Sequence, residues 1–168
     1  MTASYPGPTS PRATTRDYYL DLLDFERESA LAKVGGLSAS AQVTALPSGW
    51  TPLGLLKHLA FVEMRWLEWG FEGAPVESPF ADRVDEVFVA MADETFAVLA
   101  DVLRHRGEVT RRIISAHDLD EVGRPSERWD GEPPPRLERV LQHLAYEYAR
   151  HLGHLDIVVE LATGSVGE

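Results

Sequence analysis

The stretch YEYARHLGH, residues 146–154, decides the predicted fold, because it combines an apolar helical period with three polar side chains on one side. Glu147, His151 and His154 follow one another at intervals of four and three residues. A helix places residues with this spacing on the same face. The surrounding segment predicts a helix that starts in three consecutive prolines and ends by Gly164. Its expected buried stripe consists of Leu137, Val140, Leu141, Leu144, Tyr148, Leu152, Leu155 and Val159.

Three further amphipathic segments are predicted upstream of this helix. Thr14, with Asp17 three residues later, resembles a capping box and starts a helix to about residue 34. Thr51-Pro52 starts a second helix to about residue 71, because threonine caps a helix and proline suits its first position. A third helix is expected over about residues 93–115. No convincing strand pattern occurs, so the chain is predicted to be an all-α four-helix bundle.

The chain of 168 residues is long enough to bury a core, and we expect it to form a single domain over residues 14–164. Residues 1–13 contain three prolines separated by small polar residues, a composition that predicts a flexible leader. Residues 165–168 are expected to form a short tail.

Composition excludes several classes of protein. The net charge of −11 argues against a nucleic-acid surface, which needs a basic patch. The chain has no cysteine, so a metal must be held by His, Asp or Glu, and thiol chemistry needs a thiol from outside. No apolar run approaches the length of a membrane span, and residues 1–16 lack the hydrophobic core of a signal peptide. We therefore expect a cytoplasmic protein without membrane or nucleic-acid partners.

The polar flank of the last helix predicts a divalent metal site shared with the second helix. Glu147 and His151 lie beside the buried stripe, and His58 lies at the edge of the apolar stripe of its own helix. A buried carboxylate without a partner is costly, whereas a carboxylate that coordinates a metal is not. The spacing of four residues also allows two side chains of one helix to meet one ion.

Other interpretations of these residues stay open at this point. His143 precedes Glu147 by four residues and could pair with it instead of His151. His143 and His151 lie about 12 Å apart along a helix axis, too far to bind one ion, and we prefer His151 because it points further into the stripe. Glu147 with His151 could also be an ordinary surface pair, and His58 a hydrogen-bonded boundary residue.

Two motifs resemble a known family. Residues 48–60, SGWTPLGLLKHLA, followed by Glu63 and Trp66, are similar to the second helix of the DinB superfamily. Residues 147–156, EYARHLGHLD, are similar to its fourth helix, and the resemblance, to an uncharacterised actinobacterial branch, covers roughly residues 14–164. The resemblance implies a four-helix bundle of the DinB type that holds a divalent metal, zinc or nickel, at one end. Family analogy also implies a homodimer.

The ligand set implied by the resemblance departs from the common three-histidine site, because Glu147 replaces the first histidine of the fourth helix. This His-Glu-His pattern is similar to that of the mycothiol-dependent maleylpyruvate isomerases. On this match His58, Glu147 and His151 are the metal ligands. His154 would then support them or orient a substrate.

The resemblance implies a metal-dependent transferase that conjugates a low-molecular-weight thiol, such as mycothiol, to a small electrophile. Three protein ligands leave an open position on zinc, as in catalytic sites. For Arg65 two roles stay open, an ion pair that supports the ligands or contact with an acidic group of the thiol or substrate, and no catalytic residue is assigned. The alternatives are a metal-dependent hydrolase and a non-catalytic bundle that binds a metal or a small ligand.

Overall fold

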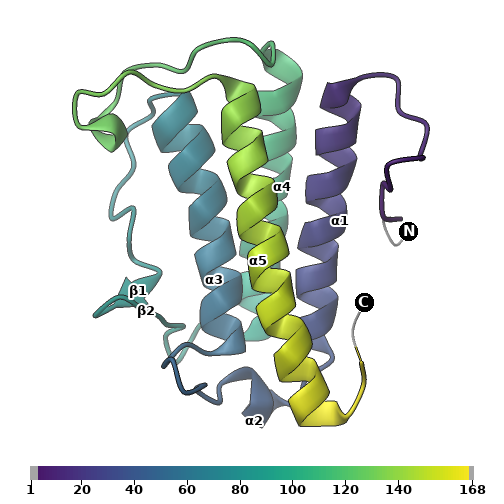
Figure 1. Ribbon diagram of the computed structural model, residues 1–168. Helices are drawn as coiled ribbons and strands as arrows, with labels where there is room; N and C mark the ends of the chain where they lie inside the picture. Colours follow the sequence, from purple (N-terminus) through teal and green to yellow (C-terminus); the bar gives the residue numbers. More distant parts are fainter. Residues whose placement is uncertain (1–3, 167–168) are drawn as a thin grey trace.

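The computed structural model describes residues 4–166, so residues 1–3 of the expected leader and 167–168 of the expected tail lie outside the described residues. The chain is mostly helical, which confirms the all-α class (Figure 1). Four long helical segments lie side by side, with α1 and α3 each packed against both α4 and α5. The α-helices are α1 Thr15–Gly35, α2 Ala39–Gln42, α3 Pro52–Glu63, α4 Phe96–Ala116 and α5 Leu137–Thr163.

Side-chain caps determine where the long helices begin. The Thr14 hydroxyl accepts a hydrogen bond from the Asp17 amide at 3.1 Å, and the Thr51 hydroxyl accepts one from the Gly54 amide at 3.0 Å. Both predicted starts are therefore confirmed. Helix α4 begins three residues later than predicted, at Phe96, because Thr95 caps it.

Helix α3 is buried on nearly every side and not only along one stripe. Eleven of its twelve residues are buried, including the charged Lys57. The segment that follows α3 covers its outer side through a two-stranded hairpin (Figure 1). Helices α4 and α5 cover its inner side.

Two features of this region correct the sequence prediction. The expected helix does not run as an α-helix to residue 71, because Met64–Phe71 is a π-helix, η1. The expectation of no strand is also wrong, since β1 Arg83–Val84 pairs antiparallel with β2 Val87–Phe88. The hairpin turn has positive φ angles at two non-glycine residues and lacks the Asn-Gly signature from which such turns are predicted. A 3₁₀ helix, η2 Glu127–Trp129, lies in the connection before α5.

A buried carboxylate links all four long helices. Glu63, at the end of α3, accepts hydrogen bonds from Arg27 of α1 at 3.0 and 3.2 Å. It also accepts hydrogen bonds from the hydroxyl groups of Thr110 in α4 and Tyr148 in α5. Because an unpaired buried charge is costly, this network favours one relative rotation of the four helices.

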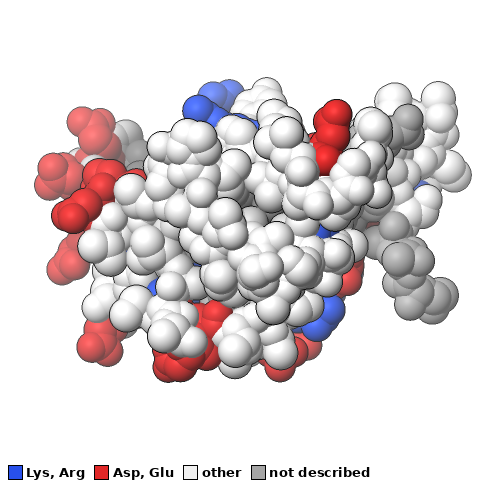
Figure 2. Space-filling model, turned by 90° about the horizontal axis from the view of Figure 1, so that it is seen from below, with Lys and Arg blue, Asp and Glu red and all other residues white. Residues whose placement is uncertain are grey.

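Charge is distributed unevenly over the surface. Figure 2 shows the end of the molecule where α2 and the last turns of α5 lie, and most of the side chains on this face are uncharged. Within residues 4–166, no helix is both long and apolar enough to cross a membrane.

Candidate metal centre

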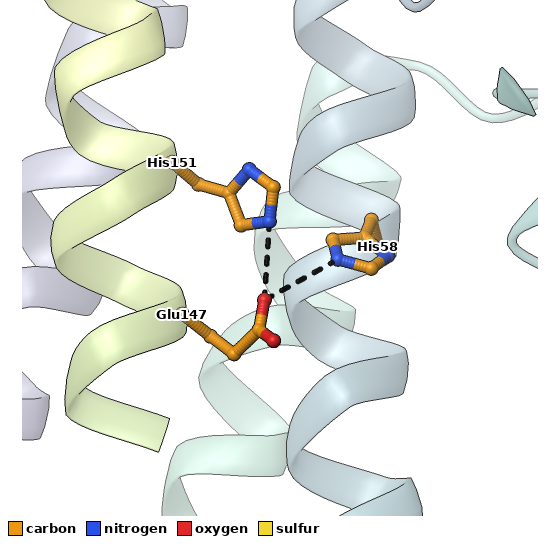
Figure 3. Close-up of side chains that lie close together, drawn as sticks. All are labelled: His58, Glu147 and His151. Atoms are coloured by element: carbon orange, nitrogen blue, oxygen red, sulfur yellow. Dashed lines mark ion pairs between the residues drawn. The ribbon is translucent and has the colours of Figure 1, made fainter. Parts of the chain in front are cut away.

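Three of the residues singled out in the sequence come together between two helices. His58 projects from α3, and Glu147 and His151 project from α5 toward it (Figure 3). Each offers one ligand atom, and the three atoms lie within 4.8 Å of one another. The Glu147 Oε2 atom lies 3.3 Å from His151 Nε2 and 4.0 Å from His58 Nε2.

The burial of these side chains follows from their places on the helices. His58 and His151 are 5% and 6% exposed, because both lie on the faces of α3 and α5 that turn toward each other. The Glu147 side chain is 25% exposed. The centre is therefore closed by protein on the histidine side and open to solvent beside the carboxylate.

The donor set fits a divalent metal such as zinc. Zinc accepts imidazole nitrogen and carboxylate oxygen at about 2.0–2.2 Å, so the ligands of a tetrahedral ion lie roughly 3.4 Å apart. The distances of 3.3 and 4.0 Å from Glu147 to the two histidines are close to this spacing. Three ligands would leave one position of a tetrahedral ion open.

Asp82 holds His58 in the form that a metal needs. Its Oδ2 atom lies 2.8 Å from His58 Nδ1, and Asp82 is fully buried. Burial alone would raise the pKa of Asp82, but hydrogen bonds from His58 and Arg65 lower it to about 2. The ionised carboxylate accepts the Nδ1 hydrogen and leaves the His58 Nε2 lone pair facing Glu147 and His151.

Asp82 is not among the residues that the sequence pattern singled out. It lies 24 residues after His58 in a loop without helical periodicity, so spacing could not connect the two residues. The only local signal is a carboxylate immediately before a short strand, which is too common to carry a prediction.

A side chain of the hairpin also packs against one face of the His58 ring. Phe88 of β2 stacks on the His58 ring with centroids 3.7 Å apart and planes inclined by 22°. The Val89 amide donates to the Asp82 carbonyl at 3.1 Å, which joins the two ends of the hairpin. Asp82 and Phe88 thus fix the tautomer and the plane of one imidazole.

A close backbone approach allows the hairpin to sit against α3. A Cβ atom at Gly54 would lie 2.3 Å from the Phe88 carbonyl oxygen. Only glycine leaves room for this contact, so Gly54 determines how near Phe88 and Asp82 come to His58.

The ionisation of the proposed ligands suits metal binding. Burial lowers the pKa of His58 despite the opposing hydrogen bond with Asp82, so the neutral imidazole is favoured. Hydrogen bonds from His143 and then His151 lower the pKa of Glu147, so its carboxylate is ionised at neutral pH.

Arg65 does not lie open to a substrate. Its guanidinium donates to Asp82 at 2.8 and 3.2 Å and to the Pro79 carbonyl at 3.0 Å, and the residue is 4% exposed. Of the two roles expected for Arg65, these contacts favour support of the ligands over contact with an acidic group of the substrate. The acidic group that it holds is Asp82 of the same chain.

His154 and His143 flank the three-residue group without belonging to it. The His154 Nδ1 atom lies 3.4 Å from His151 Nδ1, and the His154 ring lies 5.8 Å from Trp50. His143 Nε2 lies 3.2 Å from Glu147 Oε1, the oxygen that points away from the other two histidines. Glu147 therefore separates His143 from His58 and His151.

The fold and this site define a helical protein with a candidate divalent metal centre between α3 and α5. The family model described as MST, mycothiol-S-transferase, matches residues 19–164. The chain belongs to this family, which is DinB-like and confirms the resemblance seen in the sequence. Among curated proteins, no sequence matches this chain.

Proposed function

We propose that this protein is a metal-dependent mycothiol S-transferase that joins the thiol to a small electrophile. Membership of the family supports thiol transfer. The observation that carries the metal dependence is the meeting of His58, Glu147 and His151, whose donor atoms lie within 4.8 Å of one another.

The residues of the chain have distinct tasks in this proposal. His58, Glu147 and His151 hold the metal, and Asp82 orients His58. When bound, a divalent metal with an open position lowers the pKa of a thiol, so that the thiol is a nucleophile at neutral pH. The thiol sulfur then bonds to carbon of the electrophile, a leaving group departs with its bonding electrons, and the thiol proton passes to solvent.

His154 supports His151 in the same way as Asp82 supports His58. Without metal, His151 Nε2 donates to Glu147; a metal bound at that nitrogen would require the ring hydrogen on His151 Nδ1, which lies 3.4 Å from His154 Nδ1 and can donate to it. Burial, followed by the charges of His151 and Arg150, lowers the pKa of His154, so the accepting neutral form is favoured.

The family match also supports finer proposals about the whole chain. We propose that the four long helical segments form a bundle of the DinB type over residues 14–164, with residues 1–13 as a leader and 165–168 as a tail. We further propose zinc as the metal, with nickel as the alternative, and a cytoplasmic homodimer that acts on small molecules.

The test is metal analysis combined with thiol conjugation. Protein reconstituted with zinc or nickel is compared with His58→Ala and with His105→Ala, a control at an exposed position of α4. We expect about one metal ion per chain in the wild type and the control, and loss of the metal in His58→Ala. Conjugation of monochlorobimane, above the rate measured without protein, should require both metal and mycothiol.

Two results would overturn the proposal. Protein that binds no metal after reconstitution would remove the metal centre. Metal-bound protein without thiol-dependent turnover would remove the transferase activity, and turnover of an ester or amide without thiol would indicate a hydrolase instead.

A further inference from the structure

A pocket adjoins the candidate metal centre through His143. It has a volume of about 380 Å³, a size typical of small-molecule sites, and His143 forms part of its wall. His143 Nε2 lies 3.2 Å from Glu147 Oε1, while Glu147 Oε2 faces His151 and His58. A molecule in the pocket is therefore separated from the metal centre by the His143 side chain and the Glu147 carboxylate.

The walls of this pocket are mostly flat and apolar. The Trp66 and Trp129 rings line it with centroids 5.7 Å apart and planes inclined by 54°. Further apolar or aromatic surface comes from Pro133, Pro135, Val140 and Tyr146. The Trp129 indole nitrogen donates to the Gly70 carbonyl at 3.0 Å, which fixes the orientation of that ring. Rigid aromatic faces of this kind favour a planar ligand.

The lining of the pocket includes a basic side chain, although the whole chain is acidic. Arg139 lines the pocket, and no carboxylate is among the lining residues. The Arg128 guanidinium lies 4.5 Å from the centroid of Trp66 and 5.3 Å from that of Trp129. Neither arginine forms an ion pair with a described residue between 4 and 166, so their charges are available to a ligand.

We propose that this pocket binds the electrophile and that the electrophile is a planar conjugated or aromatic carboxylate. The inference rests on the proposed transferase function and names its second substrate by class. The ring lies against Trp66 and Trp129, and the acid contacts Arg139. Arg139 and His143 are one helical turn apart on α5, about 6 Å along the axis, a length that one substituted six-membered ring spans.

Calorimetry with two matched probes tests the proposal without requiring thiol or turnover. The probes are trans-cinnamate, a planar carboxylate, and cinnamyl alcohol, its neutral counterpart. We expect the wild type to bind cinnamate about 10-fold more tightly than cinnamyl alcohol, because a charge-assisted hydrogen bond contributes about this difference in affinity. Arg139→Gln should lose most of this preference. Arg112→Gln, at an exposed position of α4 outside the pocket, should keep it.

The outcomes separate this inference from the proposed function. Equal affinity for both probes, no binding of either, or an unchanged preference in Arg139→Gln would overturn the carboxylate pocket. Thiol-dependent turnover of a neutral electrophile in that case would leave the transferase function standing. A carboxylate preference that depends on Arg139 supports the pocket even where the protein shows no thiol-dependent turnover.

Discussion

The Asp82 carboxylate lies 2.8 Å from the His58 Nδ1 atom, and Arg65 holds the same carboxylate from its other side. All three residues are buried. A chain of contacts thus runs from a guanidinium through a carboxylate to an imidazole whose second nitrogen faces the candidate metal centre. Such outer contacts orient a ligand and raise its basicity.

Replacing Asp82 should weaken metal binding without removing a ligand. In Asp82→Asn the amide is a weaker acceptor for the His58 Nδ1 hydrogen, so we expect zinc affinity to fall about 10–100-fold. Competition with a chromogenic chelator measures the change. Asp85→Asn, at an exposed position in the hairpin turn, is the matched control and should bind zinc as the wild type does. Unchanged affinity in Asp82→Asn would show that the contact does not support the metal.

The two oxygens of Glu147 distinguish the histidines on either side of it. His151 faces Oε2 together with His58, whereas His143 faces Oε1. We expect His143→Ala to lower zinc affinity by about 10-fold or less, because it removes only an outer contact. His151→Ala should lower it much further, because it removes a ligand. The opposite order of effects would make His143 the ligand and His151 the supporting residue.

Replacing Gly54 tests whether the close approach of the hairpin to α3 matters for stability and zinc binding, because Gly54 contacts no metal ligand atom. In Gly54→Ala the new Cβ would lie 2.3 Å from the Phe88 carbonyl oxygen, so the hairpin must move. We expect a loss of about 1–3 kcal/mol in the free energy of unfolding, measured with urea, and weaker zinc binding.

Gly153→Ala is the matched control for that variant. Gly153 is a helical glycine of α5, and a Cβ there meets no atom within 4 Å. Because alanine favours a helix over glycine, we expect this variant to gain up to about 1 kcal/mol. If Gly54→Ala were as stable as Gly153→Ala, the close approach of the hairpin would not constrain the fold.

The buried carboxyl group of Glu26 should make the free energy of unfolding depend on pH. Burial raises the pKa of this α1 carboxyl from 4.5 to about 8, and Arg27 opposes the shift only in part. The folded protein therefore binds more protons than the unfolded chain between these two values. Its stability should fall as the pH rises through this window.

The Glu26→Gln variant removes this ionisation. We expect its free energy of unfolding to match that of the wild type at pH ~3, where Glu26 is neutral in both states, and to exceed it by about 2–4 kcal/mol at pH ~9. Urea unfolding at several pH values measures the difference. Glu28→Gln, an exposed change in the same helix, should show no such trend. If the difference in the free energy of unfolding between Glu26→Gln and the wild type were the same at every pH, the raised pKa of Glu26 would be contradicted.

The helices could be predicted because their signals are local. A threonine cap and its amide partner at Thr14 or Thr51 lie three residues apart, and an apolar stripe repeats within a single helix. The π-helix and the two-residue strands left no comparable pattern. Their conformations depend on packing against residues that are distant in the sequence.

The helical class could be determined from the sequence alone, because helical periodicity is a property of neighbouring residues. The same periodicity indicated that His58, Glu147 and His151 lie on the sides of their helices that face the core. Only the tertiary structure decided that Asp82 orients His58, that Arg65 is occupied by Asp82, and that the two oxygens of Glu147 serve different histidines. These contacts join a loop to a helix and one helix to another. They depend on how the connection between α3 and α4 packs, which no spacing within a segment reveals.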